Sequence, residues 1–426
     1  MRLRVRPATR LHGTISVPGD KSISHRALMF AALADGVSDL HGWLPAADCE
    51  ATLRCIRALG MHVERPAPDR LIVHGGGLRG LRPAPGPLDC GGSGTTMRLL
   101  MGILAGFPFP STLIGNSQLS RRPMERVAQP LRQMGAEVIT TEGHAPVHVR
   151  GGSLRGIRYE LPVASAQVKS ALLLAGLYAD RPTTVIEPAP ARDHTERLLS
   201  AMGAFLERDG GSITIHPAQQ LRPISLIIPG DPSSAAFLIA AALLISGSEV
   251  EIFNVLLNPT RLGWVEAWQA MGAPLWVRPE GETGGEPVGH IRVAAASRLQ
   301  AVEVSGPLVP RMIDEFPIFA VVATQAEGLT QVRDAAELRV KESDRIAALA
   351  EELRRMGARI EERPDGFAIH GPTPLRGAVV HSHGDHRLAM ALAVAGLGLC
   401  ADVAQAQSGA ILRGDQPGRG RGGMPT

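Results

Sequence analysis

The stretch PGDKSISHR, residues 18–26, combines residue types that bind anions. Its Pro-Gly turn and Asp20 predict the start of a helix, because aspartate is a favoured N-cap residue and an apolar run follows directly. Lys21, Ser22 and Arg26 then lie near the N-terminus of that helix. A helix N-terminus carries partial positive charge and free backbone N–H groups. The segment therefore predicts an anion site, although solvated surface cations would give the same pattern.

Further polar segments precede apolar helix patterns in the first half of the chain. Residues 91–98, GGSGTTMR, form a glycine-rich turn that lets backbone N–H groups approach an anion. Residues 120–124, SRRPM, add a basic cluster, and residues 164–170, ASAQVKS, begin another helix. Residues 191–196, ARDHTE, repeat the arrangement. Helix capping alone explains the GDPSS stretch at residues 230–234.

The second half of the chain supplies acidic groups. Asp314 stands beside apolar residues in RMIDEFP, residues 311–317, and such surroundings raise a carboxyl pKa toward neutrality, which suits a general base. Lys341 and Arg345 are four residues apart and would share one face of a predicted helix, toward a ligand or toward solvent. The HGDH stretch, residues 383–386, fits no familiar zinc spacing, so we expect no metal there.

Composition limits the class of function. The chain has 426 residues, of which 44% are hydrophobic and 20% charged, which is typical of a soluble globular protein with two domains. Aromatic residues make up 4% and the net charge is +3, so we expect no nucleic-acid partner. No apolar run reaches membrane-spanning length, so we expect no membrane association. The cysteines form no CxxC pair, which indicates reduced thiols and a cytoplasmic location. They are Cys49, Cys55, Cys90 and Cys400.

A Met-Gly or Leu-Gly pair recurs at nearly even spacing along the chain, each time between a helix pattern and a β-prone run. Glycine directly after a helix adopts the left-handed conformation at little cost, which predicts a C-terminal cap. Five such units are visible, and a sixth would end near the C-terminus, so we expect an α/β fold of two domains with three units each. The glycines are Gly60, Gly135, Gly203, Gly272 and Gly357.

Two similar segments mark the expected domain crossings. Residues 226–231, LIIPGD, resemble residues 17–20, VPGD. The alternation of arginine with apolar residues at the N-terminus predicts a strand. We expect one domain to comprise residues 1–17 with residues 230–426, so that the N-terminal strand joins it, and the other to comprise residues 18–229.

Ten motifs occur in an order that identifies a family. They are PGDKSISHRA, SGTTMRLL, RRPM, SAQVKSALLLAG, RDHTE, GDPSSAA, NPTR, IDEFP, RVKESDR and GDHRLAMA. Together they resemble the 5-enolpyruvylshikimate-3-phosphate synthase family, and its class II bacterial members in particular, from about residue 5 to about residue 400. The resemblance implies the enolpyruvyl transferase fold, with two globular domains of three βαβαββ repeats each and the active site in the cleft between them.

The resemblance also implies an activity. Members transfer the enolpyruvyl group of phosphoenolpyruvate to the 5-hydroxyl of shikimate 3-phosphate and release phosphate, by addition and elimination through a tetrahedral intermediate. This reaction is the sixth step of the shikimate pathway and a target of glyphosate. The implied partners are these two anionic substrates, with no cofactor and no metal, and the implied protein is a cytoplasmic monomer.

Site residues follow from the resemblance, motif by motif. Asp314 would be the general base for the 5-hydroxyl, Glu342 would handle the proton at the methylene carbon, and Lys21 would be a third proton carrier. Shikimate 3-phosphate would contact Lys21, Ser22, Arg26, Ser165, Ala166, Gln167, Arg192, Asp314 and Lys341. Phosphoenolpyruvate would contact Lys21, Gly94, Arg122, Gln167, Arg345 and Arg387.

The chain departs from the family pattern at two places, and two alternatives follow. Gly92 stands where the family carries asparagine, and the missing amide should weaken phosphoenolpyruvate binding. Residues 409–426 lack the expected terminal helix, and their many glycines and prolines predict an unpacked segment that leaves the sixth repeat incomplete. An inactive anion-binding homologue with an aberrant C-terminus is one alternative. A UDP-N-acetylglucosamine enolpyruvyl transferase is the other, but that family's reactive cysteine is absent near Arg122.

Overall fold

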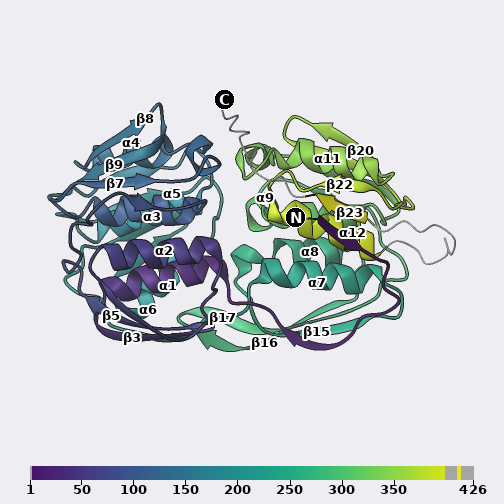
Figure 1. Cartoon of the computed structure of the whole chain (residues 1–426), viewed down its shortest axis with the longest axis horizontal. Coiled ribbons are helices and arrows are strands. Elements are labelled where there is room, and N and C mark those ends of the chain that lie inside the picture. Colours follow the sequence, from purple (N-terminus) through teal and green to yellow (C-terminus); the bar gives the residue numbers. More distant parts are fainter. Residues whose placement is uncertain (1, 399–409, 414–426) are drawn as a thin grey trace, which may run out of the picture.

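The computed structural model describes residues 2–398 and the strand formed by residues 410–413. The chain forms two lobes that lie side by side, each built of small sheets with helices packed between and against them (Figure 1). Six sheets are present among the described residues, five with four strands and one with three. The fold class predicted from the repeat, α/β with three units in each lobe, is confirmed.

Each four-stranded sheet of the first lobe has one parallel pair followed by two antiparallel pairs, which is the βαβαββ pattern of the repeat. The elements of this lobe are α1 (Lys21–Leu33), β3 (Asp35–His41), α2 (Ala47–Ala58), β4 (His62–Ala67), β5 (Arg70–Gly76), β6 (Leu88–Asp89), α3 (Gly94–Leu104), β7 (Ser111–Ile114), η1 (Leu119–Arg121), α4 (Glu125–Gln133), β8 (Glu137–Thr141), β9 (His144–Arg150), β10 (Arg158–Glu160), α5 (Ala166–Gly176), β11 (Thr183–Ile186), α6 (His194–Ala201), β12 (Leu206–Asp209), β13 (Ser212–Ile215) and β14 (Ser225–Ile227).

The second lobe repeats the same strand pattern in two further sheets and begins a third. Its elements are β1 (Arg2–Val5), β2 (His12–Ser16), α7 (Pro232–Leu244), β15 (Glu249–Leu256), η2 (Pro259–Arg261), α8 (Gly263–Ala270), β16 (Leu275–Thr283), β17 (Glu286–Ala294), β18 (Glu303–Val304), α9 (Leu308–Arg311), α10 (Phe316–Ala323), β19 (Gly328–Val332), η3 (Ala336–Val340), α11 (Arg345–Arg355), β20 (Arg359–Arg363), β21 (Gly366–Gly371), β22 (Val379–His381), α12 (His386–Leu397) and β23 (Ala410–Arg413).

At each point where the chain crosses between the lobes, the strand that precedes one lobe in sequence joins a sheet of the other lobe. Strand β2 precedes the first lobe in sequence but pairs in parallel with β15 of the second. Strand β14 follows the first lobe and pairs in parallel with β3, so it supplies the strand that the first unit lacks. The crossings touch each other through an antiparallel bridge between Gly19 and Gly230. Both predicted crossing segments therefore meet at one point between the lobes.

The sixth sheet is completed by the N-terminus. Strand β23 pairs in parallel with β22 and antiparallel with β1, which confirms the predicted N-terminal strand. The prediction that residues 409–426 are unpacked is wrong for residues 410–413, because backbone pairing with two neighbouring strands holds this short segment in spite of the glycines around it. The rest of that prediction falls on residues outside the described part of the chain.

The five repeat glycines end their helices as predicted. Each has a positive φ, between 86° and 100°, directly after the C-cap residue of α2, α4, α6, α8 or α11. A residue with a Cβ is strained at such angles, so the spacing of these glycines fixes where each unit turns back into its sheet.

Two separate hydrophobic cores fill the lobes. One gathers residues from Ile23 to Ile228 together with Leu256, and the other gathers residues from Ala235 to Ala395. Helices α1 and α7 lie inside these cores, buried on nearly every side. The two cores support domain boundaries near residues 17 and 230, and those boundaries stay a prediction.

A buried guanidinium ties the two crossings together. Arg261, in the NPTR motif, donates to Asp20 Oδ2 at 2.8 Å and to Asp231 Oδ1 at 3.0 Å. Asp20 caps α1 by accepting from the N–H of Ile23, and Asp231 caps α7 by accepting from the N–H of Ser233. Burial lowers the pKa of Arg261, but the two aspartates outweigh it and raise that pKa. One charged side chain thus sets the starts of both central helices.

Replacing this guanidinium should destabilise the chain strongly. Arg261→Met leaves two buried carboxylates without their cation, and breaking a buried pair typically costs about 3–5 kcal/mol. Urea unfolding at pH 7 measures the free energy. Arg298→Met is the matched control, because its pair with Glu327 is exposed and contributes little. Equal stability of the two variants would contradict the assigned role of Arg261.

Candidate active site

Most of the residues predicted for the site lie at or beside helix starts in both lobes. Lys21, Gly94 and Ala166 are the first residues of α1, α3 and α5. Arg345 is the first residue of α11, and Arg387 is the second residue of α12. Side chains at the N-cap positions Asp20, Ser93, Ser165, Asp344 and Asp385 accept backbone N–H groups there, as capping requires.

Asp314 is the centre of the charged cluster between the lobes. Its Oδ2 atom lies 2.6 Å from Arg192 Nη2 and 3.5 Å from Arg387 Nη2, and its Oδ1 atom lies 3.2 Å from Arg345 Nη1. Arg387 also donates to the backbone carbonyl of Asp314 at 3.2 Å. The pair with Arg192 joins the first lobe to the second. Three predicted binding residues therefore meet on one predicted catalytic carboxylate.

The expected rise in the pKa of Asp314 is wrong. Burial does raise this pKa, but the positive charges of Arg387, Arg192, Arg345 and Lys341 outweigh burial and hold the pKa well below its ordinary value. The apolar neighbours in sequence are not the neighbours that decide the charge state. Asp314 is an ionised carboxylate in this arrangement.

Arg345 holds a second carboxylate beside the first. Its Nη2 atom lies 2.6 Å from Glu342 Oε2 and its Nε atom 2.8 Å from Asp385 Oδ2, and its side chain is 1% exposed. Burial acts to raise the pKa of Glu342. The positive charges of Arg345 and Arg122 outweigh burial and lower this pKa to about 2. Glu342 Oε1 lies 3.9 Å from Arg122 Nη1 of the first lobe. Both predicted proton carriers of the second lobe are therefore ionised and paired with cations.

Lys341 does not share a helix face with Arg345, so that prediction is wrong. Residue Asp344 caps the helix with its side chain, and α11 begins only at Arg345. Lys341 lies before the cap in extended backbone after η3. Its Nζ atom lies 3.5 Å from Glu337 Oε1, which also accepts from Arg126 Nη1 at 3.1 Å across the lobes. Burial lowers the pKa of Lys341, and Glu337 and Asp314 partly restore it.

The glycine-rich turn packs against guanidinium groups. A Cβ on Gly94 would lie 2.8 Å from Arg122 Nη1 and 3.1 Å from Arg98 Nη1. Arg98 donates to Gln167 Oε1, and Gln167 donates to Thr95 Oγ1 at 2.9 Å. Gly94 at the start of α3, Gln167 on α5 and Arg122 after η1 therefore lie close together. A Cβ on Gly92 would lie 3.2 Å from Asn116 Nδ2, so the side-chain amide of Asn116 lies next to this glycine.

Arg26 lies in a pocket of hydroxyl groups. Its Nε atom donates to Thr195 Oγ1 at 2.7 Å, its Nη2 atom to Ser170 Oγ at 2.9 Å, and its Nη1 atom to the carbonyl of Ser22 at 3.0 Å. The side chain is buried, and burial lowers its pKa to about 10, against the raising effect of Glu196 and Asp20. The Nζ atom of Lys21 pairs with Asp48 Oδ2 at 3.2 Å, within the first lobe.

Several charged residues of the site were missed by the sequence analysis. Arg98 lies inside the quoted SGTTMRLL motif and Arg126 two residues after RRPM, but neither was assigned to the site, because a single arginine on a helix gives no signal of its own. Asp48 and Glu337 lie outside every motif. Their pairing with Lys21 and Arg126, which are distant in sequence, reveals them, and Glu337 also pairs with Lys341 four residues away.

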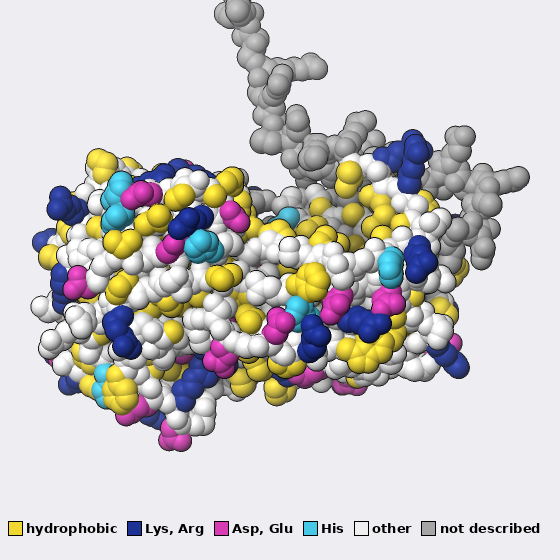
Figure 2. All heavy atoms as spheres, turned by 90° about the horizontal axis from the view of Figure 1, so that it is seen from below, with side chains coloured by type: hydrophobic (Ala, Val, Ile, Leu, Met, Phe, Trp, Pro, Cys, Tyr) yellow, Lys and Arg dark blue, Asp and Glu magenta, His cyan; other side chains and the backbone are white. Residues whose placement is uncertain are grey.

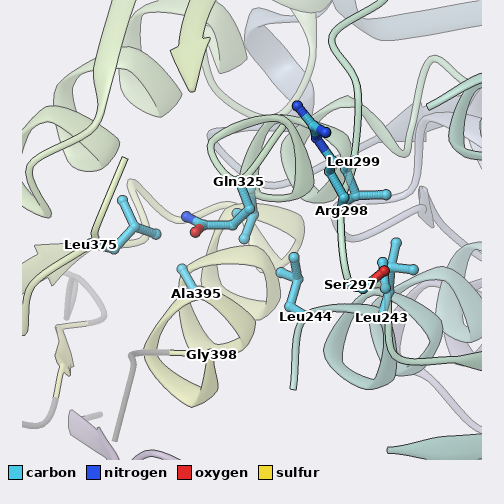
Figure 3. A pocket seen from close by; sticks show the side chains of 11 residues that line it. Leu243, Leu244, Ser297, Arg298, Leu299, Gln325, Leu375, Ala395 and Gly398 are labelled. Atoms are coloured by element: carbon cyan, nitrogen blue, oxygen red, sulfur yellow. The ribbon is translucent and has the colours of Figure 1, made fainter. Parts of the chain in front are cut away.

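One cavity among the described residues is not part of this site. It has a volume of about 210 Å³ and lies in the second lobe among α7, α10 and α12 (Figure 3). Its lining is mostly apolar, with four leucines, and includes the polar side chains of Ser297, Arg298 and Gln325. This cavity contains none of the predicted site residues.

Among the described residues, no helix combines the length and the apolar character that a membrane-spanning helix needs.

Comparison with known proteins decides the family. The model of EPSP synthase (3-phosphoshikimate 1-carboxyvinyltransferase) matches residues 5–414. The chain belongs to the EPSP synthase family. A 3-phosphoshikimate 1-carboxyvinyltransferase of Desulforudis audaxviator is 53% identical over 399 residues, which cover 93% of each protein.

Solved structures agree with the family and with the fold. EPSP synthase from Acinetobacter baumannii has a TM-score of 0.84 and 41% identity, with 96% of this chain and 93% of that chain covered. The enolpyruvyl transferase NikO from Streptomyces tendae has a TM-score of 0.76 at 19% identity, with 97% and 92% covered, and shows the shared fold alone. The chain is a carboxyvinyl transferase of the shikimate pathway, and the alternative acceptor UDP-N-acetylglucosamine is not favoured.

The lowered pKa of Glu342 predicts an acid-sensitive contribution to stability. A carboxylate whose folded pKa is depressed stabilises the fold above its ordinary pKa of 4.5, and this contribution disappears as the pH falls toward about 2. Glu342→Gln should therefore lower the free energy of unfolding at pH 7, and its deficit relative to the unaltered chain should shrink below pH 4.5. Urea unfolding across this range measures the deficit.

Glu361→Gln is the control for this titration, because its side chain is exposed on β20. It should leave the curve of stability against pH unchanged. A deficit in Glu342→Gln that stays constant from pH 7 to pH 3 would contradict the pairing described for Glu342.

Proposed function

We propose that the cations at the helix starts hold the two polyanionic substrates between the lobes. The 3-phosphate of shikimate 3-phosphate would lie at the start of α1, with Lys21, Ser22 and Arg26, and against Ser165 at the start of α5. The N–H groups and partial charges of two helix N-termini favour a phosphate there. Ala166, Gln167, Arg192, Asp314 and Lys341 complete the proposed contacts to this substrate.

Phosphoenolpyruvate would lie next to shikimate 3-phosphate. It would contact the guanidinium groups that stay accessible because Gly94 has no side chain. Arg122, Arg345 and Arg387 present planar donors that match carboxylate and phosphate groups in pairs. The absence of a Cβ on Gly94 gives an anion access to Arg122 and Arg98. Lys21 and Gln167 would contact both substrates.

The internal carboxylates hold these cations until the substrates arrive. Asp314 and Glu342 pair with Arg192, Arg345 and Arg387, so no guanidinium of this group lies buried without an anion. Substrate phosphate and carboxylate groups would neutralise the same cations. Because those cations are what depress the two carboxyl pKa values, substrate binding raises both toward the range useful for proton transfer.

This change supplies the acid and base that the reaction needs. Asp314 accepts the proton of the 5-hydroxyl as its oxygen attacks C2 of phosphoenolpyruvate, and the methylene carbon takes a proton to become a methyl group. Elimination of phosphate then removes a proton from that methyl group and restores the double bond. Glu342 takes up a proton once the substrates neutralise its cations. It then donates this proton to the methylene carbon and recovers it in the elimination, with Lys21 as a further carrier, and Asp314 passes the hydroxyl proton to the departing phosphate. The convergence of three guanidinium groups on Asp314 is the observation that carries this proposal.

We propose further that the chain acts as a monomer in a reducing cytoplasm. Both lobes of one chain supply the cluster, so no second copy is needed to complete it. Cys49, Cys55 and Cys90 are free and buried, which fits a reducing compartment; Cys400 lies outside the described residues.

The activity should depend on shikimate 3-phosphate and on no divalent metal. Phosphate release from phosphoenolpyruvate should be negligible without the acceptor and unchanged by EDTA, because arginine and lysine neutralise the substrate charges. A colorimetric phosphate assay on the purified chain measures both. Preference for UDP-N-acetylglucosamine, or loss in EDTA restored by Mg²⁺, would contradict the proposal.

Removing the proposed base should separate turnover from binding. Asp314→Asn should lower kcat by roughly 10²–10⁴-fold, as expected for a positioned general base, while shikimate 3-phosphate still binds. Steady-state kinetics and calorimetry provide the two readouts. Asp39→Asn is the matched control, since Asp39 also pairs with an arginine, Arg70, but on the outer face of the first lobe. Near-full turnover in Asp314→Asn would exclude it as the base.

A further inference from the structure

Two histidines and a glutamate gather on the outer face of the β4–β5 hairpin. His62 and His74 stand directly opposite each other in the antiparallel pair, and Glu64 follows His62 on the same face. Val63 and Val73, on the other face, are buried in the core of the lobe. Figure 2 views the molecule from the side on which β3 and β5 lie in Figure 1, where charged and histidine side chains are interspersed with hydrophobic ones on that lobe. The pleat of the hairpin therefore turns these three side chains toward solvent together.

The three side chains have the spacing of metal ligands. His74 Nε2 lies 2.6 Å and His62 Nε2 lies 3.6 Å from Glu64 Oε1, and the two imidazole centroids are 4.8 Å apart. Bonds of 2.0–2.2 Å in a tetrahedral Zn²⁺ site place ligand atoms about 3.4 Å from one another. The observed separations bracket that value, so small side-chain rotations would bring all three onto one ion.

Two other clusters of ligand residues are less suited to a metal. Asp193, His194 and Glu286 are buried, and Asn258 already donates to both carboxylates. Glu352 is buried between His383 and the backbone N–H of His381. An ion would have to displace these hydrogen bonds and lose its own hydration.

In the hairpin cluster an ion displaces only the hydrogen bond between His74 and Glu64, and it does not have to enter the core. Its side chains are between 39% and 70% exposed, so an ion can enter and keep water in its remaining positions. Within the described residues, His62, Glu64 and His74 make their polar side-chain contacts only with one another. Paired imidazoles with a carboxylate suit Zn²⁺, Cu²⁺ or Ni²⁺, whereas Mg²⁺ and Ca²⁺ prefer oxygen ligands alone.

We propose that His62, Glu64 and His74 bind one divalent transition-metal ion, with Zn²⁺ as the physiological class, at a site separate from the catalytic cluster. The ion would join β4 to β5 beside the β-bulge that follows Glu64, where the pairing register shifts. An ion that binds only the folded hairpin stabilises it in proportion to its free concentration. Catalysis stays independent of this ion, because in the described part of the chain the three side chains make polar contacts with one another and with none of the charged residues around Asp314.

Zinc titration of the tag-free, EDTA-treated and dialysed chain tests this site. Calorimetry with ZnCl₂ at pH 7.5 should show one equivalent bound, and the ion should raise the melting temperature. The double variant His62→Gln/His74→Gln should weaken binding at least tenfold and lose the thermal shift. MgCl₂ should produce no signal, and the phosphate-release activity of the double variant should equal that of the unaltered chain.

A matched control replaces two histidines of the neighbouring hairpin, which belong to no such cluster. His144→Gln/His148→Gln, on β9, should keep the zinc affinity and the thermal shift. Unchanged zinc binding in His62→Gln/His74→Gln would overturn the proposal, and so would a chain that binds no zinc. Loss of binding in His383→Gln with full binding in the hairpin variant would overturn it as well, because the ion would then lie at Glu352.

Discussion

Buried guanidinium groups need an anion, and in this chain one carboxylate serves three of them. Asp314 pairs with Arg192, Arg345 and Arg387, which come from both lobes. Desolvating these cations without a partner would be costly, so the same charges that await two polyanionic substrates also hold the lobes together without them. The need to neutralise positive charge therefore governs the contact between the lobes, the ionisation of Asp314 and Glu342, and the proposed chemistry.

The frame that positions these charges depends on the two chain crossings. Arg261 binds the N-cap carboxylates Asp20 and Asp231, so the starts of α1 and α7 are fixed to each other. Helix α1 carries Lys21, Ser22 and Arg26 on its first turns. The backbone N–H of Lys21 also donates at 3.3 Å to Oδ2 of Asp231, the N-cap residue of α7. The cations proposed to bind substrate thus stand on a buried ion-pair network, which favours a preorganised site.

Local features of the fold were predictable, because they depend on a few adjacent residues. The caps at Asp20 and Ser165 and the five left-handed glycines follow from short-range hydrogen bonds and from backbone sterics. The even spacing of these glycines was enough to count the repeats, and the domain crossings were predicted from the similarity of residues 17–20 and 226–231.

Features that depend on distant residues were not predictable. The pKa of Asp314 was misjudged because the arginines that pair with it are 31 to 122 residues away, while several of its sequence neighbours are apolar. The exchange of β2 and β14 between lobes depends on pairing across the whole first lobe. Lys341 was placed on a helix because nothing local shows that Asp344, rather than an earlier residue, caps α11. The strand β23 was missed because its partners lie at the other end of the chain and in the preceding unit.

In the proposed mechanism, substrate anions release Asp314 and Glu342 from their cations. Carbon-13 NMR titration of the Glu342 carboxyl tests this release in the free chain and in the chain saturated with shikimate 3-phosphate and inorganic phosphate, which cannot react with each other. The variant Glu342→Gln assigns the signal. We expect a pKa of about 2 in the free chain and a clear rise toward the ordinary value of 4.5 in the complex. A pKa that stays near 2 with both anions bound would contradict the mechanism.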